Sequence, residues 1–327
     1  MRRLSAALLA APLVAAAALA GCSSSPAQSG GSNESVMVKG AEGKAPTVHI
    51  PAKKADSALV TKTLVQGHGD KLTAGDSYLA NFDVFVWRGN TNKLLFSSFK
   101  STPEVLPVTM GLTGLQKALT GERVGSRVLA VLPPKYGYGP QGNSQIGVKP
   151  GDTLVWVVDL LHAFPPNASA SGKHLSNGGG KLPTISAGPG GAPQISVPKN
   201  TPPSKLVVKT LIKGSGAPIT PKQSIVVRYV GSIWRTGKVF NSNWPSASQP
   251  SVPPSVFTLG QLIPAWNTGL VGIPVGSRVM LVVPPSQGYG KAGNSQAGIK
   301  GTDTLVFVLD VLSTAPGAPS PQPVPSG

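Results

Sequence analysis

The residues of this chain that could act on a substrate are mainly aromatic, because the residue types of most other catalytic chemistry are scarce. The 327-residue sequence contains one cysteine, Cys22, and four histidines, His49, His68, His162 and His174. A single cysteine cannot form an internal disulfide, a CxxC redox pair or a thiolate zinc site. The histidines are scattered and lack metal-ligand spacing. We therefore expect no bound metal and no cofactor.

One tyrosine-bearing stretch occurs twice. Val275 to Gly290 reads VGSRVMLVVPPSQGYG, and Val124 to Gly139 reads VGSRVLAVLPPKYGYG, 151 residues earlier (275 − 124). Each copy predicts a strand, a Pro-Pro break, a glycine-rich loop and then a strongly apolar strand. Two copies at one fixed offset indicate a duplicated domain. A unit of about 100 residues is large enough to bury a core of its own.

The elements that must position these loops are mostly strands. Alternating apolar residues predict strands at 59–65 and 78–87 in the first copy, and at 206–212 and 225–234 in the second. Each copy has one helix-like segment, at 112–119 and near 263–271. The expected class is α+β.

The charge of the chain argues against a nucleic-acid site. The formal net charge is +17, but only 13% of the residues are charged, so the excess comes from scarce acids. No run of lysine and arginine is interleaved with aromatic residues as a nucleic-acid site requires. We expect a solvated basic surface near anionic envelope polymers or lipids.

The first 22 residues resemble the signal of bacterial lipoproteins. Arg2 and Arg3 precede an apolar stretch at 6–20, which ends in Leu19-Ala-Gly-Cys22. The resemblance implies removal of residues 1–21 and attachment of lipid, including palmitate, to Cys22. Two or more acyl chains hold a protein stably on a membrane. The alternative is an ordinary signal peptide followed by a free thiol.

Three segments have the composition of unpacked chain. Residues 22–55 predict a flexible tether, residues 165–203 a Pro/Gly/Ser-rich linker with few residues that could pack, and residues 316–327 a disordered tail. The folded parts expected between them are domain 1 (residues 56–164) and domain 2 (residues 204–315).

A set of short motifs in domain 2 is specific by its order and spacing. The motifs are Tyr229-Val-Gly231, Gly237-Lys-Val-Phe240, Phe257-Thr-Leu-Gly260, Ile263, Trp266, Val275-Gly-Ser277, Gly288-Tyr-Gly290 and Leu305-Val-Phe307. Through them domain 2 resembles FKBP-type peptidyl-prolyl cis/trans isomerases over nearly its whole length, and domain 1 resembles them more weakly. The resemblance implies an antiparallel sheet wrapped around one short helix, with a shallow apolar pocket between them.

The resemblance also implies which residues form the pocket of domain 2. The catalytic set would be Tyr229, Phe240, Asn241, Ile263, Trp266, Tyr289 and Phe307, with Leu262 and Ile299 contacting the substrate. Trp266 would be the floor. The backbone N–H of Ile263 and the hydroxyl of Tyr289 would donate hydrogen bonds to substrate carbonyls. Phe257, an aromatic residue on a strand, is expected in the core.

The chain departs from the family pattern at several positions. The family usually has an aspartate after the phenylalanine at Phe240, where this chain has Asn241, and often an aromatic residue at Ser255. Domain 1 departs further: we expect Phe82, Ser97 and Leu115 in place of the first tyrosine, the aspartate and the floor tryptophan, while Phe96, Tyr138, Val148 and Trp156 match. Domain 1 is therefore expected to be a degenerate copy.

The leading hypothesis is a prolyl isomerase, active mainly in domain 2, that assists the folding of secreted or envelope proteins. It would act on proline-containing polypeptides as a monomer, lipid-anchored on the extracytoplasmic side of the cell membrane. The alternative is a non-catalytic FKBP-like module that binds or chaperones such chains. Asn241 and the altered domain 1 favour the alternative, whereas Tyr289 and Trp266 favour the enzyme. A purely structural envelope lipoprotein would leave those aromatic residues unexplained.

Overall fold

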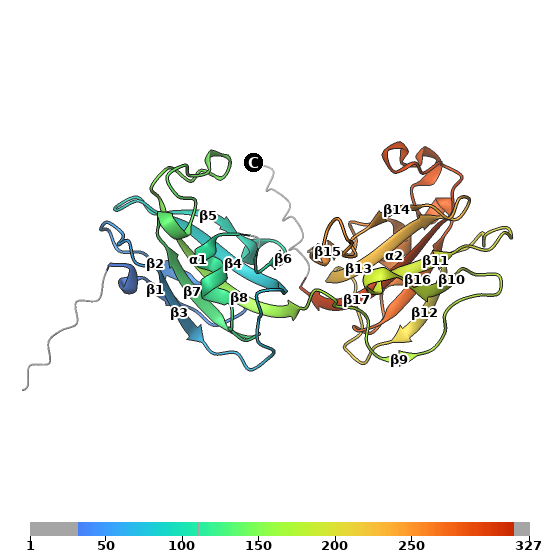
Figure 1. Cartoon of the computed structure of the whole chain (residues 1–327), viewed down its shortest axis with the longest axis horizontal. Coiled ribbons are helices and arrows are strands. Elements are labelled where there is room, and N and C mark those ends of the chain that lie inside the picture. Colours follow the sequence, from blue (N-terminus) through green and yellow to red (C-terminus); the bar gives the residue numbers. More distant parts are fainter. Residues whose placement is uncertain (1–31, 110, 251, 317–327) are drawn as a thin grey trace, which may run out of the picture. The chain divides into compact units, whose positions relative to one another are not determined.

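The computed structural model describes residues 32–109, 111–250 and 252–316, and it contains one large antiparallel sheet in each domain (Figure 1). The expected signal peptide, the lipidation site at Cys22 and all but the first residue of the expected tail lie outside these described residues. Within the described ranges, no helix combines the length and the apolar character that a membrane crossing requires.

The sheet of domain 1 has the strand order β3-β7-β8-β4-β5, with β6 also paired to β4. One face of the long strand β4 packs against the short helix α1 through alternate residues, including Tyr78, Phe82 and Val86, as the two-residue period of a strand requires. The elements are β3 (Val60–Val65), β4 (Ser77–Trp87), β5 (Lys93–Ser97), η2 (Ser98–Lys100), β6 (Glu104–Pro107), α1 (Thr113–Leu119), β7 (Arg127–Leu132), η3 (Pro134–Tyr136), η4 (Ser144–Ile146) and β8 (Thr153–Phe164).

Domain 2 repeats this arrangement. Its sheet has the order β14-β13-β17-β16-β12-β9, with β15 also paired to β13, and Trp266 of α2 belongs to its core. The elements are β12 (Val207–Lys213), β13 (Ser224–Ile233), β14 (Val239–Ser242), β15 (Ser255–Thr258), α2 (Pro264–Gly269), β16 (Arg278–Val283), η6 (Pro285–Gln287), η7 (Gly290–Ala292), η8 (Ser295–Ala297) and β17 (Leu305–Ala315). Antiparallel sheets with few helices agree with the expected class.

The repeated Val-Gly-Ser-Arg motif joins three strands. In domain 1, Gly125 adopts a left-handed φ of 89°, which favours glycine. The hydroxyl of Ser126 accepts a hydrogen bond of 2.9 Å from the N–H of Gly67, and Arg127 forms a buried ion pair of 2.6 Å with Asp159 of β8. Domain 2 repeats these contacts with the same residue types, so the motif serves the scaffold.

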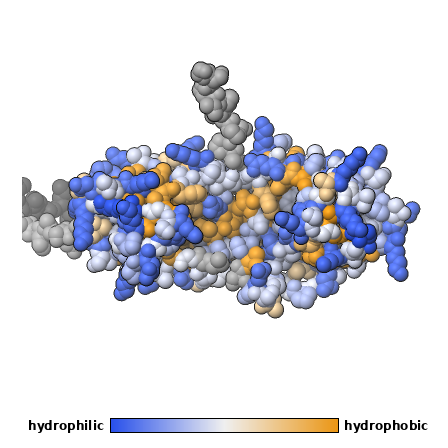
Figure 2. Space-filling model, turned by 90° about the horizontal axis from the view of Figure 1, so that it is seen from above, coloured by the Kyte–Doolittle hydropathy of each residue, from blue (hydrophilic) through white to orange (hydrophobic). Residues whose placement is uncertain are grey.

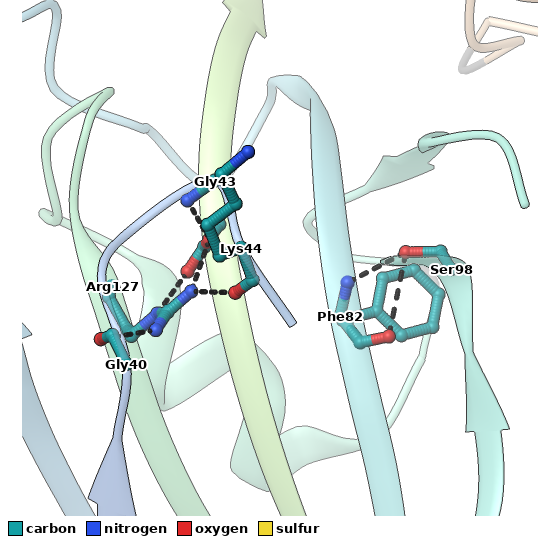
Figure 3. A network of polar contacts seen from close by, with 7 residues as sticks. Gly40, Gly43, Lys44, Phe82, Ser98 and Arg127 are labelled. Carbon is teal, nitrogen blue, oxygen red and sulfur yellow. Dashed lines mark hydrogen bonds and ion pairs between the residues drawn. The ribbon is translucent and has the colours of Figure 1, made fainter. Parts of the chain in front are cut away.

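The expected tether folds onto domain 1. Strands β1 (Met37–Lys39) and β2 (Thr47–His49), which follow η1 (Ser32–Ser35), form a hairpin. Val36 and Ile50 are buried beside Trp87 on the face of the sheet that does not contact α1. The guanidinium of Arg127 donates to the carbonyl oxygens of Gly40 and Lys44 at 2.8 and 2.7 Å (Figure 3). The prediction of a flexible tether is therefore wrong for these residues.

The expected linker likewise folds onto domain 2. It contains β9 (Lys173–His174), β10 (Thr184–Ala187), η5 (Pro189–Gly191) and β11 (Pro193–Ser196). β9 extends the domain 2 sheet beside β12, and β10 and β11 form a hairpin. Ile185 is buried with Trp234 and Met280 on the sheet face away from α2. The prediction that this segment has few packing residues is wrong, because its isolated apolar side chains complete a core.

Candidate active site

Domain 2 contains a cavity of about 130 Å³ whose walls are largely aromatic. Strands β13, β14, β15 and β17, helix α2 and the two loops that precede α2 and follow β16 all contribute to it. The lining residues are Tyr229, Phe240, Asn241, Phe257, Leu262, Ile263, Trp266, Tyr289 and Phe307. Residues from six separate stretches of sequence therefore meet at one concave site, which is typical of a binding pocket.

Trp266 holds the aromatic walls in place. Its ring meets Tyr229, Phe257 and Phe307 edge to face, with centroid distances of 5.5, 5.4 and 5.3 Å. Edge-to-face pairs place a positive ring edge on a negative ring face, so each pair stabilises one orientation. Phe240 contacts Phe307 in the same way at 5.6 Å. The side chain is only 4% exposed, so the tryptophan acts as a rigid base to the cavity.

Few polar groups reach this cavity. The hydroxyl of Tyr229 donates a 3.0 Å hydrogen bond to Oδ1 of Asn241. Burial, and secondarily Tyr289, raises the pKa of Tyr229 above its usual value of 10.0, so this hydroxyl remains a donor near neutral pH. Ile263 directly precedes α2, and a residue in that position has a backbone N–H with no partner inside the helix. The site thus combines apolar walls with a small number of neutral donors.

The structure gathers most of the residues predicted for domain 2. The seven predicted catalytic residues and Leu262 all line the cavity. Ile299 does not line it; this side chain is 4% exposed and packs in the core. Phe257 was predicted to be core, and that was incomplete, because its ring lines the cavity while contacting Trp266. The ring of Phe257 therefore packs in the core and also lines the cavity.

Ion pairs fix the loop that follows the tyrosine. Arg235 pairs with Asp303 at 2.8 Å, and the same carboxylate accepts the N–H of Lys300 at 2.8 Å. The hydrogen bond from Arg235 holds the pKa of Asp303 below its usual value. In domain 1, Arg88 and Asp152 form the same pair at 2.6 Å, and Arg88 also donates to the carbonyl of Gly147. Both domains therefore anchor this loop in one way.

Domain 1 has a larger cavity of about 440 Å³ at the corresponding place. Phe82 lies between two other rings, with centroids 5.3 Å from Phe96 and 5.3 Å from Trp156. Of the residues predicted here, Phe82, Phe96, Tyr138, Val148 and Trp156 line the cavity, whereas Ser97 and Leu115 do not. Six residues that were not predicted complete the lining: Val84, Leu95, Glu104, Gln145, Ile146 and Leu154.

The strand register corrects one correspondence between the domains. Phe96 lies opposite Val84 of β4, and Asn241 lies opposite Gly231 at the matching place on β13. Ser98 supports this alignment, because its hydroxyl accepts the N–H of Phe82 at 2.8 Å (Figure 3), as Asn243 accepts that of Tyr229. Phe96 therefore takes the place of Asn241, and Leu95 takes that of Phe240. The predicted correspondence of Phe96 with Phe240 and of Ser97 with the aspartate position is wrong by one residue.

Both cavities open at exposed aromatic side chains. Tyr289 is 37% exposed and Phe96 is 40% exposed. Figure 2 shows one face of the molecule, on which hydrophobic residues form patches among hydrophilic ones. Within the described ranges, no group of three or more histidine, cysteine, aspartate or glutamate residues could hold a metal ion.

Comparison with known proteins agrees with this geometry. The model of the family described as FKBP-type peptidyl-prolyl cis-trans isomerase matches residues 69–161 and 216–312, which together exceed half of the chain. The chain belongs to this family. Each match covers the helix, the cavity and most of the sheet of one domain, so the chain has two FKBP-like regions. The family acts on proline-containing polypeptides. The chain is accordingly a prolyl isomerase by family.

Several curated proteins resemble one FKBP region of the chain. A "Probable FK506-binding protein" of Corynebacterium glutamicum is 37% identical over 121 residues, which cover 37% of this chain and 97% of that protein. An "FK506-binding protein" of Streptomyces anulatus is 32% identical over 123 residues, covering 37% and 95%. Among solved structures, FkpA from Escherichia coli is 35% identical, covers 35% of this chain and 49% of its own, and gives a TM-score of 0.30.

Proposed function

We propose that the cavity of domain 2 is the isomerisation site and carries most of the activity of this FKBP-type chain. The observation that supports this most is the Trp266 floor, whose ring contacts three of the cavity's aromatic walls. Domain 1 has Leu115 in the corresponding helix, and that residue does not line its cavity. A ring-shaped apolar group such as proline fits a small, rigid aromatic cavity better than a wide one.

The reaction needs no nucleophile, because no covalent bond is broken. Rotation about an Xaa–Pro bond must overcome about 18–20 kcal/mol, which arises from amide resonance. A cavity that holds the proline ring and excludes water favours the twisted amide, whose carbonyl oxygen carries less negative charge. Lowering the barrier by about 5–8 kcal/mol corresponds to roughly 10⁴–10⁶-fold. Aromatic walls and neutral donors are suited to this task.

Two donors are placed to orient the substrate. In this proposal the backbone N–H of Ile263 and the hydroxyl of Tyr289 donate to peptide carbonyls of the bound chain. Asn241 keeps the hydroxyl of Tyr229 directed along the cavity wall through their 3.0 Å hydrogen bond. A neutral amide stands where the family usually has a carboxylate, so the site lacks a negative charge at this point.

The proposal is tested by measuring isomerisation of a proline tetrapeptide with the full chain and two variants. Tyr289→Phe removes the proposed donor and keeps the ring, so kcat/KM should fall by roughly tenfold if the hydroxyl contributes about 1–2 kcal/mol. Tyr138→Phe makes the same change in domain 1 and should alter the total activity little. Equal losses in the two variants would contradict the assignment to domain 2.

The alternative remains a non-catalytic binding module for proline-containing chains, and Asn241 is the observation that favours it. The same assay distinguishes the two. A chain that binds the proline peptide but leaves its isomerisation at the uncatalysed rate would be a binding module. A rate that rises with protein concentration and falls in Tyr289→Phe would exclude that reading.

We further propose that the chain is a monomeric, lipid-anchored helper in the folding of secreted or envelope proteins, held on the extracytoplasmic side of the cell membrane. The support is the Leu19-Ala-Gly-Cys22 sequence, which lies outside the described residues. Cys22→Ser should move the protein from the detergent phase to the aqueous phase in a partitioning experiment. Unchanged partitioning would refute the anchor.

A further inference from the structure

The cavity of domain 1 differs from that of domain 2 in shape and in chemistry. Its volume of about 440 Å³ lies within the range of about 300–1,000 Å³ that is usual for ligand sites, whereas 130 Å³ lies below it. Phe96, Phe82 and Trp156 lie in a row, with neighbouring centroids 5.3 Å apart. Neighbouring rings are tilted by 32° and 33°, so the three form a continuous apolar wall rather than an edge-to-face enclosure like that of domain 2.

Glu104 adds a negative charge to this wall. Glu104 is the first residue of β6, where it lies opposite Ala80 of β4, and it lines the cavity. Ser255 takes the equivalent position in β15 of domain 2. It is half-buried, and burial raises the pKa of its carboxyl above the usual value. Among the described residues, no hydrogen bond or ion pair reaches this carboxylate. An unpaired acid inside an aromatic cavity costs free energy unless something satisfies it.

Four other acids of the chain have an internal arginine partner, whereas Asp83, which is buried with one oxygen unpartnered, does not line the cavity. Asp152, Asp159, Asp303 and Asp310 each pair with an arginine at 2.6–2.8 Å. The chain has only 12 acidic residues against 29 basic ones, so an acid left without a basic partner is notable. A cation supplied from outside the chain would complete the site.

We propose that the cavity of domain 1 binds an arginine side chain of an extended polypeptide, with the guanidinium at Glu104 and against the aromatic wall. A guanidinium is planar, so it stacks on aromatic faces, and its fork of N–H donors matches a carboxylate. The apolar stem of the side chain lies along Phe82 and Phe96. Domain 1 is thus a second, charge-selective site, and this role does not depend on isomerisation.

The test uses the full chain labelled with 5-fluorotryptophan, which gives one fluorine signal for each tryptophan, and the Trp156 signal is assigned with Trp156→Phe. The probe is a proline-free peptide, acetyl-Gly-Arg-Gly-Ala-amide, compared with the same peptide carrying citrulline, which keeps the shape of arginine without its charge. The arginine peptide should shift the Trp156 signal. The citrulline peptide should bind with an affinity at least about tenfold lower.

The variants locate the effect at one carboxylate. Glu104→Gln keeps the size of the side chain and should weaken arginine binding about tenfold, to the level of citrulline. Glu122→Gln is the matched control, because that exposed acid accepts a hydrogen bond from Thr63 and does not line the cavity. Glu104→Lys should reverse the preference toward a peptide with glutamate in place of arginine.

Three results would overturn the proposal. They are equal affinity for the arginine and citrulline peptides, unchanged affinity in Glu104→Gln, and a peptide-induced shift at Trp266 without one at Trp156. Because the peptides contain no proline, failure here would leave the isomerisation assay of domain 2 unaffected.

Discussion

Replacing Trp266 by leucine tests whether the aromatic floor has a role in catalysis beyond its role in stability. The side chain is 4% exposed and makes three edge-to-face contacts at 5.3–5.5 Å. Each such contact contributes about 0.5–1.5 kcal/mol, and truncation of a buried tryptophan to alanine costs about 3–5 kcal/mol. Leucine refills part of the space, so we expect domain 2 to lose about 2–4 kcal/mol of unfolding free energy.

Trp234→Leu provides the matched control. Trp234 is 7% exposed, donates to the carbonyl of Asn200 at 3.1 Å and packs on the opposite face of the same sheet, away from the cavity. It should destabilise domain 2 by a similar amount in urea unfolding. Its kcat/KM toward a proline tetrapeptide should stay near the wild-type value, while that of Trp266→Leu falls at least about tenfold.

The assay must be made at a temperature where both variants are folded, as judged by near-UV circular dichroism. Equal activity losses in the two variants would mean that the loss follows stability alone. Retention of full activity in Trp266→Leu would refute a catalytic role for the Trp266 ring. Either result would remove the main support for placing the activity in domain 2.

Three further predictions concern charged and polar groups. Burial raises the pKa of Glu104 above 4.5, so folded domain 1 retains this proton to higher pH than the unfolded chain. Glu104→Gln should therefore have a larger free energy of unfolding than wild type at neutral pH. In urea titrations this difference should shrink as the pH falls below the raised pKa. A constant difference would contradict this. Arg278→Met leaves the fully buried carboxylate of Asp310 without its ion pair and should cost about 3–5 kcal/mol in urea unfolding, whereas replacing both residues by apolar ones should cost much less. Asn241→Asp supplies a charged acceptor to the hydroxyl of Tyr229 and should raise kcat/KM several-fold; a decrease would show that the amide is the better partner.

The scaffold was predictable because the residues that make its contacts recur in both halves of the sequence. The Val-Gly-Ser-Arg motif needs a glycine at φ 89°, a hydroxyl for Gly67 and an arginine for Asp159, and these needs recur 151 residues later. The domain 2 cavity followed from family motifs whose order is specific. The β1–β2 and β10–β11 hairpins were not predicted from composition, because proline and glycine are frequent both in turns and in unpacked chain.

A signal for the hairpins does exist in the sequence. Ala45 to Pro51 reads APTVHIP and Ala192 to Pro198 reads APQISVP, and the two are 147 residues apart (192 − 45). The same offset separates Trp87 from Trp234, whose indole N–H groups donate to Lys53 and Asn200, also 147 apart. A duplication that includes the segment before each domain would have predicted that this segment is folded.

The cavity of domain 1 was harder to predict because the chain that leads into its edge strand β5 is two residues longer, counted between equivalent residues, than the chain that leads into β14. Leu95 follows Trp87 by eight residues (95 − 87), whereas Phe240 follows Trp234 by six (240 − 234). Because the ladders of both domains shift at the equivalent place, Leu95 rather than Phe96 takes the place of the family phenylalanine. A one-residue shift moves a side chain to the other face of a strand. Glu104 was missed because a charged residue on a short strand carries no signal of what lies in front of it.

The hairpins change where either half of the protein can be cut. A fragment that begins at residue 204 would lack the β10–β11 hairpin and would leave Met280, Val282, Val306 and Val308 facing water, a row of apolar strand residues prone to aggregation. Because each hairpin precedes its sheet in the chain, it is also synthesised first and is available to cover that face as soon as the strands pair. A fragment of the second half should therefore begin before residue 170, whose N–H donates to Asp310, if it is to be soluble.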